Sequence, residues 1–356
     1  MFIRIDKQKN NLLIKAYKDG DINKFRKLID SGANVNCLCD DGYSLVFWVL
    51  KNINNLKNNV DFFDELIKND VYFEKIGLER NLFRIAMDCD SDYYIDQLLK
   101  HNKNINQKYE YNIYGDDNGP LIFDTIKYNM NYIEKVLNYK PDLKIFNSMG
   151  YTVINYFFLH CHAYCLFNSS HDNFRKLLLA GADFNLENTS NGMGGIHSMA
   201  CHCRDDSYFK ILNELKIPFD INHSNNTVSS PIFWAVKWDN LFAVEILLEM
   251  GVDLKTFQED GACALTMAAV CNHKEIFDLL LEREAELPIF NENKDNILHH
   301  LVRRYDCEPY YVETILNNRP ELSVMENNDG MTPYDVFNNQ ESKNRHIAKI
   351  LSNNKK

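Results

Sequence analysis

The 356-residue sequence lacks several features that mark common functional classes. It contains no run of roughly 18 apolar residues, so we expect no transmembrane helix and no membrane partner. The first residues, Met1–Lys7, have no apolar core of sufficient length, so we expect no secretory signal peptide. A glycine-rich phosphate loop and a His-Glu-x-x-His motif are also missing, which removes common signatures of nucleotide-dependent and zinc-dependent enzymes.

Positive charge is in short supply. The chain has 39 Lys and Arg against 50 Asp and Glu, a net charge of −11. Binding to nucleic acid requires basic side chains that neutralise phosphates, so we expect no nucleic-acid partner. An acidic surface meets a basic partner more readily, because charge assists the encounter of the two molecules. We therefore expect a basic protein partner.

The ten cysteines have no regular spacing of the kind found in disulfide frameworks. Free thiols in a reducing compartment are the simplest interpretation. We expect a cytoplasmic protein, either in the cell that makes it or in a host cell if it is delivered there as an effector.

A recurring segment is the main feature that the sequence does contain. Leu177–Asn185 reads Leu-Leu-Leu-Ala-Gly-Ala-Asp-Phe-Asn, and close relatives of it occur at Leu28–Asn36 and Leu247–Leu254. Repetition of this kind predicts a stack of small units in place of one closed core around a cleft. Each unit is too short to be stable alone and must pack on its neighbours.

The best-formed unit runs from Asp260 to about Leu287. The turn signal Asp260-Gly261 is followed by an apolar stretch with Ala268-Ala269, a break at Asn272-His273, and a second apolar stretch. This unit resembles the ankyrin repeat, whose Thr-Pro-Leu-His-x-Ala-Ala, Gly-His and Leu-Leu-x-x-Gly-Ala-Asp-x-Asn elements are recognisable in pieces along the chain. The resemblance implies an all-α ankyrin-repeat solenoid with nine to ten helix-turn-helix units and short β-turn fingers.

The spacing of the units supports a single ankyrin-repeat domain over residues 1–356. Equivalent points recur every 32 to 41 residues, which brackets the ankyrin period of about 33. We expect capping repeats with polar outer faces at both ends. The N-terminal capping repeat is assigned to 1–38, the internal repeats to 39–326 and the C-terminal capping repeat to 327–356.

Two departures from the family pattern affect loops and turns. The family prefers Gly after the second helix, where a left-handed residue ends it without steric cost. This chain instead has Asp70, Asn102, Lys140, Glu284 and Arg319. Lys, Glu and Arg tolerate that conformation poorly, so we expect a different turn there. Extra residues fall near 52–60, 109–118 and 162–171, and whether those loops contact a partner stays open.

A Cys/His cluster is the sharpest chemical candidate. It comprises His160, Cys161, Cys201, His202 and Cys203. Such groups bind zinc when about four converge at roughly 2.0–2.3 Å, but equivalent positions on neighbouring helices lie about 8–10 Å apart. A stack of small helices also offers no catalytic pocket. We expect no metal, no cofactor and no catalytic residue, and keep a metal-binding or enzymatic protein as the alternative.

The resemblance implies that a partner is contacted by the fingers and first-helix ends along the concave face. Mapped onto this sequence, that rule gives Tyr43, Asn52, Asp88, Tyr151, His160, His202, Trp238, Cys271 and Arg304. Trp238 stands out because a large aromatic has little structural reason to face solvent, and interface hot spots favour Trp. Trp48 and Trp234 fall one row inward, and we expect them in the core.

The expected function is non-catalytic protein–protein recognition by a monomer. Two settings stay open: a microbial effector or adaptor that acts on a host, and an immunity-type inhibitor that neutralises a toxin. The acidic balance leans slightly towards a stand-alone inhibitor or adaptor.

Overall fold

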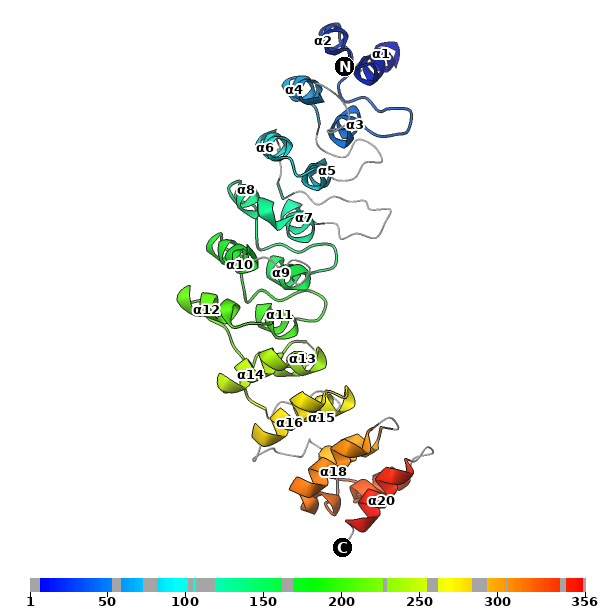
Figure 1. Ribbon diagram of the computed structural model, residues 1–356, viewed down its shortest axis with the longest axis vertical. Helices are drawn as coiled ribbons and strands as arrows, with labels where there is room; N and C mark the ends of the chain where they lie inside the picture. Colours follow the sequence, from blue (N-terminus) through cyan, green and yellow to red (C-terminus); the bar gives the residue numbers. More distant parts are fainter. Residues whose placement is uncertain are drawn as a thin grey trace. The chain divides into compact units, whose positions relative to one another are not determined.

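A computed structural model describes residues 7–52, 59–72, 82–101, 105–106, 119–161, 169–226, 229–254, 262–283, 293–304, 307–339 and 344–354 (Figure 1). This part of the chain forms twenty α-helices and two short 3₁₀ helices. Its extended backbone is limited to two isolated antiparallel bridges, between Leu38 and Ser44 and between Phe146 and Thr152. None of its helices is long and apolar enough to cross a membrane.

The chain divides into two compact units, which we call unit 1 (1–160 with 179–181) and unit 2 (161–178 with 182–356). The division falls inside the repeat formed by α9 (Val153–Cys161) and α10 (Ser169–Leu179). Unit 1 also contains α1 (Lys7–Lys18), α2 (Ile22–Asp30), α3 (Leu45–Lys51), α4 (Asn59–Lys68), α5 (Leu82–Asp88), α6 (Asp92–His101), α7 (Leu121–Tyr128), η1 (Met130–Tyr132) and α8 (Ile133–Leu137). Unit 2 also contains α11 (Gly195–His202), α12 (Ser207–Glu214), α13 (Pro231–Lys237), α14 (Leu241–Glu249), α15 (Ala264–Val270), α16 (Lys274–Arg283), α17 (Ile297–Val302), α18 (Pro309–Asn318), η3 (Pro320–Ser323), α19 (Pro333–Asn338) and α20 (Arg345–Asn353).

Consecutive helices pair, and the pairs stack within each unit. In unit 1 the first helices α3, α5 and α7 contact one another in sequence, and α2 contacts α4. In unit 2 the first helices α11, α13, α15, α17 and α19 form the same kind of row, while α14 contacts α16 and α18 contacts α20. Figure 1 shows the two rows in each unit. The repeat period of the sequence is therefore the period of the helix pairs.

Aromatic rings and small side chains both help to fill the cores. In unit 1 the Phe62 ring lies edge-on to Phe25 and Tyr17, at centroid distances of 5.0 and 5.3 Å. In unit 2 the small residues Ala268 and Ala269 are buried on α15. Two alanines let α15 pack against both α13 and α17, which it contacts.

The turns after the second helices correct one sequence-based prediction. A different turn was expected at Lys140, yet Lys140 adopts the left-handed conformation of Gly251, with φ of 51° and 79°, and Asp70 does the same with φ of 55°. For Arg319 the prediction is confirmed, because its φ of −140° lies outside that region. Asn102 and Glu284 lie outside the described residues. The same holds for most of the three long loops near 52–60, 109–118 and 162–171.

Two first helices of unit 2 begin with a buried histidine. His299 Nδ1 accepts the backbone N–H of Asn296 at 3.1 Å, and its Nε2–H donates to the Met331 carbonyl of the next finger at 2.9 Å. His197 is equivalent: Nδ1 accepts the Gly194 N–H at 3.2 Å, and Nε2–H faces the Ser229 carbonyl at 3.1 Å. Each ring therefore caps its own helix and ties it to the next repeat.

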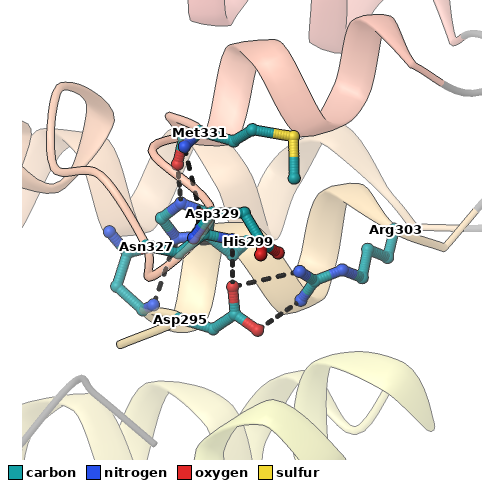
Figure 2. Close-up of polar contacts among 7 residues, drawn as sticks. Asp295, His299, Arg303, Asn327, Asp329 and Met331 are labelled. Carbon is teal, nitrogen blue, oxygen red and sulfur yellow. Dashed lines mark hydrogen bonds and ion pairs between the residues drawn. The ribbon is translucent and has the colours of Figure 1, made fainter. Parts of the chain in front are cut away.

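Figure 2 shows the Asp295 carboxylate near His299, where it accepts hydrogen bonds from neighbouring side chains. Asp295 receives two hydrogen bonds from Arg303, at 2.7 and 3.0 Å, and one from the Asn327 amide at 2.9 Å. Burial raises the pKa of Asp295, but these hydrogen bonds outweigh it and leave the pKa below its usual value. The Asn327 side chain also accepts the Met331 N–H at 3.1 Å, which holds the finger against the helix.

Candidate partner-binding surface

The ends of the first helices in unit 2 carry a half-exposed aromatic cluster. Trp238 caps α13, and its backbone N–H donates to the Trp234 carbonyl at 3.1 Å. The preceding turns of α13 bury Ile232, Ala235 and Val236, so the helix phase directs Trp238 outward. Its side chain is 53% exposed, and the His202 ring lies 6.0 Å away. The structure thus brings together two predicted contact residues, His202 and Trp238.

Two further predicted residues, Cys271 and Arg304, belong to the same part of unit 2. Cys271 is half-buried, and its Sγ lies 3.3 Å from the Met267 sulfur. Burial raises the pKa of the Cys271 thiol, against the lowering effect of the nearby Lys237 and Arg304 charges. Arg304 is exposed. We call His202, Trp238, Cys271 and Arg304, with the adjoining Lys237, the Trp238 surface.

Lys237 shows that Trp234 is not a core residue. Its ammonium lies 4.7 Å from the centroid of the Trp234 ring, a cation–π geometry. The expectation that Trp234 and Trp48 are buried in the core is wrong, because both are half-buried. Each lies about one turn before the C-cap of its first helix, Trp48 before Asn52 and Trp234 before Trp238.

The five predicted residues in unit 1 have varied surroundings. Tyr43 is half-buried and stacks on Phe47 of α3 at a centroid distance of 4.3 Å, so it packs on α3 more than it projects from the finger. The Asn52 amide donates to the Tyr17 hydroxyl at 3.2 Å. Asp88 is exposed, whereas Tyr151 and His160 are half-buried, and the His160 ring packs 4.3 Å from Tyr156.

Residues 159–258 and 196–291 match the family profile described as "Ankyrin repeats (3 copies)". Residues 159–291 of the chain are therefore ankyrin repeats. Among solved structures, the crystal structure of the ankyrin repeat domain of Bcl-3, titled a unique member of the IκB protein family, matches with a TM-score of 0.51. It is 21% identical, and the match covers 67% of this chain and 99% of that one, so the likeness concerns the fold. A search of curated proteins returned no significant match.

The family and the all-α solenoid fold predicted from the sequence are confirmed. Ankyrin repeats generally serve as protein–protein interaction modules, and the family is typically non-catalytic. The residues of the Trp238 surface were predicted from the repeat register, because equivalent positions in successive repeats face the same way.

The cysteines of the Cys/His cluster are buried in their repeats. Cys161, Cys201 and Cys203 are buried thiols, and burial raises the pKa of Cys201 to about 12. A thiol with such a pKa is protonated at neutral pH, whereas both nucleophilic attack and metal ligation need the thiolate. In the described parts of the chain, no three His, Cys, Asp or Glu residues are grouped as a metal site.

Proposed function

We propose that this ankyrin-repeat protein recognises a protein partner without catalysis, and that the Trp238 surface contacts that partner. The exposure of Trp238 carries the proposal. Large buried side chains form most of each repeat, yet this indole stands 53% exposed beside His202. Trp and Arg are enriched among residues that dominate binding energy, and both are present here.

The surface has the rigidity that recognition needs. Trp238 and Cys271 cap helices, and the helices behind them are tied to neighbouring repeats through buried contacts. Asn240, just after Trp238, donates from its side chain to the Ala200 and Cys203 carbonyls at 2.9 and 2.7 Å. A surface held in this way loses little conformational freedom on binding, which favours affinity.

The proposal also includes the five predicted contact residues of unit 1. Tyr43, Asn52, Asp88, Tyr151 and His160 lie in unit 1 and are proposed partner contacts on the strength of the repeat register. The protein is proposed to be monomeric, to act in the cytoplasm of the producing cell or of a host cell, and to meet a basic partner because of its net charge of −11. Effector or adaptor and toxin-neutralising inhibitor are the two proposed settings.

A capture experiment with a matched control tests the proposal. The full chain is immobilised and exposed to lysate of its source cell, and retained proteins are identified by mass spectrometry. Trp238→Ala is expected to lower the affinity for the retained partner at least thirtyfold, corresponding to about 2 kcal/mol for a hot-spot residue. Met250→Ala is the control, because Met250 is also an exposed apolar residue but caps the second helix α14.

Equal capture by wild type and Trp238→Ala would remove the Trp238 surface from the interface. Loss of capture in both Trp238→Ala and Met250→Ala would indicate a partner that also contacts the second helices. Thermal unfolding of each variant shows whether a loss of capture reflects the surface or the fold.

A further inference from the structure

Unit 1 contains a hollow of about 400 Å³ at the first finger. Tyr17 and Lys18 of α1 line one side, Asp40 and Asp41 of the finger line another, and Trp48 and Asn52 of α3 and its C-cap complete it. Its volume lies near the lower end of the range for ligand pockets, roughly 300–1,000 Å³. The hollow can therefore hold one side chain and cannot hold a folded segment. We call it the Asp–Trp pocket.

Hydrogen bonds fix the walls of the Asp–Trp pocket before any ligand arrives. Asp41 Oδ1 accepts the Trp48 indole N–H at 3.3 Å and the Tyr43 backbone N–H at 3.2 Å. The Tyr17 hydroxyl donates to the Trp48 carbonyl at 2.9 Å and accepts from the Asn52 amide at 3.2 Å. The indole and the Asp41 carboxylate thus have a set mutual orientation.

The charges around the pocket favour a cation. Asp40 and Asp41 are exposed, and in the described residues neither forms an ion pair. Lys18 also lines the pocket, so the lining carries two negative charges and one positive charge. Burial raises the pKa of the Cys39 thiol, which also lines the pocket, to about 12, with further raising contributions from Cys37, Asp41 and Asp40 against a lowering one from Lys18. This thiol therefore adds no charge to the lining near neutral pH.

The Trp48 ring already makes one cation–π contact. The Lys51 ammonium lies 5.0 Å from the Trp48 centroid and 5.6 Å from the Phe47 centroid. Cations within about 6 Å of an indole face are attracted by its quadrupole. Lys51 does not line the pocket, so the part of the indole that does remains available.

We propose that the Asp–Trp pocket binds an arginine side chain of the protein partner. The aliphatic stem of arginine would lie along the Tyr17 and Trp48 rings, and its guanidinium would face Asp40 and Asp41. A guanidinium is planar, stacks on aromatic rings and pairs with carboxylates through several N–H donors, whereas an ammonium is a strongly hydrated point charge. This inference rests on the proposed function and gives the expected basic partner a specific point of contact.

The test uses a small probe and needs no partner. In the full chain with Trp234→Phe and Trp238→Phe, Trp48 is the remaining tryptophan, and its fluorescence reports on the pocket. N-acetyl-arginine amide is titrated against N-acetyl-citrulline amide, which has the same shape and no charge. We expect a saturable change with the arginine probe and a midpoint at least fivefold higher with the citrulline probe.

Two isosteric variants assign the effect. Asp40→Asn and Asp41→Asn are each expected to raise the arginine midpoint about fivefold. In Asp41→Asn the amide oxygen still accepts the Trp48 N–H, so the wall is retained. Equal midpoints for both probes would overturn the proposal, as would saturable binding of N-acetyl-glutamate amide in preference, which would assign the pocket to Lys18. A probe that never saturates would also overturn it.

The outcome is separable from that of the proposed function. If the arginine probe fails while Trp238→Ala still abolishes capture, recognition stands and the Asp–Trp pocket does not. If the arginine probe binds while Trp238→Ala captures the partner as well as wild type does, the pocket proposal is supported and the Trp238 surface is excluded from the interface.

Discussion

Two first helices of unit 1 and two of unit 2 begin with different chemistry. In unit 1 the Ser44 hydroxyl accepts the Phe47 N–H at 3.2 Å, and the Thr152 hydroxyl accepts the Asn155 N–H at 3.1 Å. In unit 2 the imidazoles of His197 and His299 cap their helices and also reach carbonyls of the next repeat. A short N-cap side chain therefore serves one helix, whereas a histidine three residues further on, at the third position of the helix, joins two repeats.

The difference also concerns ionisation. Both histidine hydrogen bonds require the neutral ring with the proton on Nε2, because Nδ1 must accept an N–H. Burial, followed by the charge of His223, lowers the pKa of His197 to about 4. Burial lowers the pKa of His299 as well. Ser44 and Thr152 have no comparable ionisation, so acid distinguishes the two kinds of cap.

Removal of a histidine cap should have the largest effect. His299→Ala leaves the Met331 carbonyl and the Asn296 N–H without their partner and opens a cavity, so we expect unit 2 to lose about 3 kcal/mol. Ser44→Ala removes only a local cap and should cost unit 1 about 1 kcal/mol. Urea unfolding followed by tryptophan fluorescence measures both, with Trp234→Phe and Trp238→Phe in the chain that reports unit 1 through Trp48, and Trp48→Phe in the chain that reports unit 2. Equal losses of unfolding free energy in His299→Ala and Ser44→Ala would contradict the proposed difference between the two kinds of cap.

Acid should produce the next largest effect. The unfolded chain protonates His197 near its usual pKa of about 6.5, while the folded chain resists protonation until about pH 4. Stability from neutral His197 is therefore complete above pH 6.5 and declines as the pH falls, by about 2 kcal/mol at pH 5.

A matched variant isolates this contribution. Between pH 7 and pH 5, unit 2 of the wild type should lose about 2 kcal/mol more than unit 2 of His197→Ala, measured by the same urea titrations. The exposed His–carboxylate pairs of unit 2, such as His171–Asp205 at 3.1 Å, remain in both proteins and cancel. An identical pH response in the two proteins would show that His197 is protonated in the folded state.

The smallest expected effects concern the left-handed turns. Lys140 in unit 1 has a φ of 51°, which costs a residue with a Cβ about 1 kcal/mol, so Lys140→Gly should stabilise unit 1 by up to about 1 kcal/mol. Gly251→Ala should destabilise unit 2 by a similar amount, through backbone strain alone, because no atom lies within 4 Å of the added Cβ. Thermal unfolding checks both signs. A loss of stability in Lys140→Gly would mean that the Lys140 side chain makes a compensating contact.

Much of the fold could be predicted from the sequence because helix packing is local and periodic. Leu-rich segments at a spacing near 33 residues specify which faces are buried, and the register then places Trp238 at a helix end. The turn at Lys140 was mispredicted for an energetic reason. About 1 kcal/mol of local strain is smaller than the packing energy that holds two helices in place.

The Asp–Trp pocket could not be predicted because it depends on contacts between distant residues. Tyr17 and Trp48 are 31 positions apart, and their hydrogen bond is visible only once α1 and α3 are packed. Trp48 was misread as core since periodicity specifies the face of a helix and does not report how fully a large ring on its flank is covered. The nearest signal in the sequence is the Asp40-Asp41 pair beside Tyr43.

Hydrogen exchange of the full chain, with and without its captured partner, tests the central claim most directly. The account predicts that the partner slows exchange at the ends of α11, α13 and α15, around His202, Trp238 and Cys271. Met250 and the rest of the second helix α14 should keep their exchange rates. Slowed exchange confined to the second helices, with no change around Trp238, would contradict recognition through the Trp238 surface.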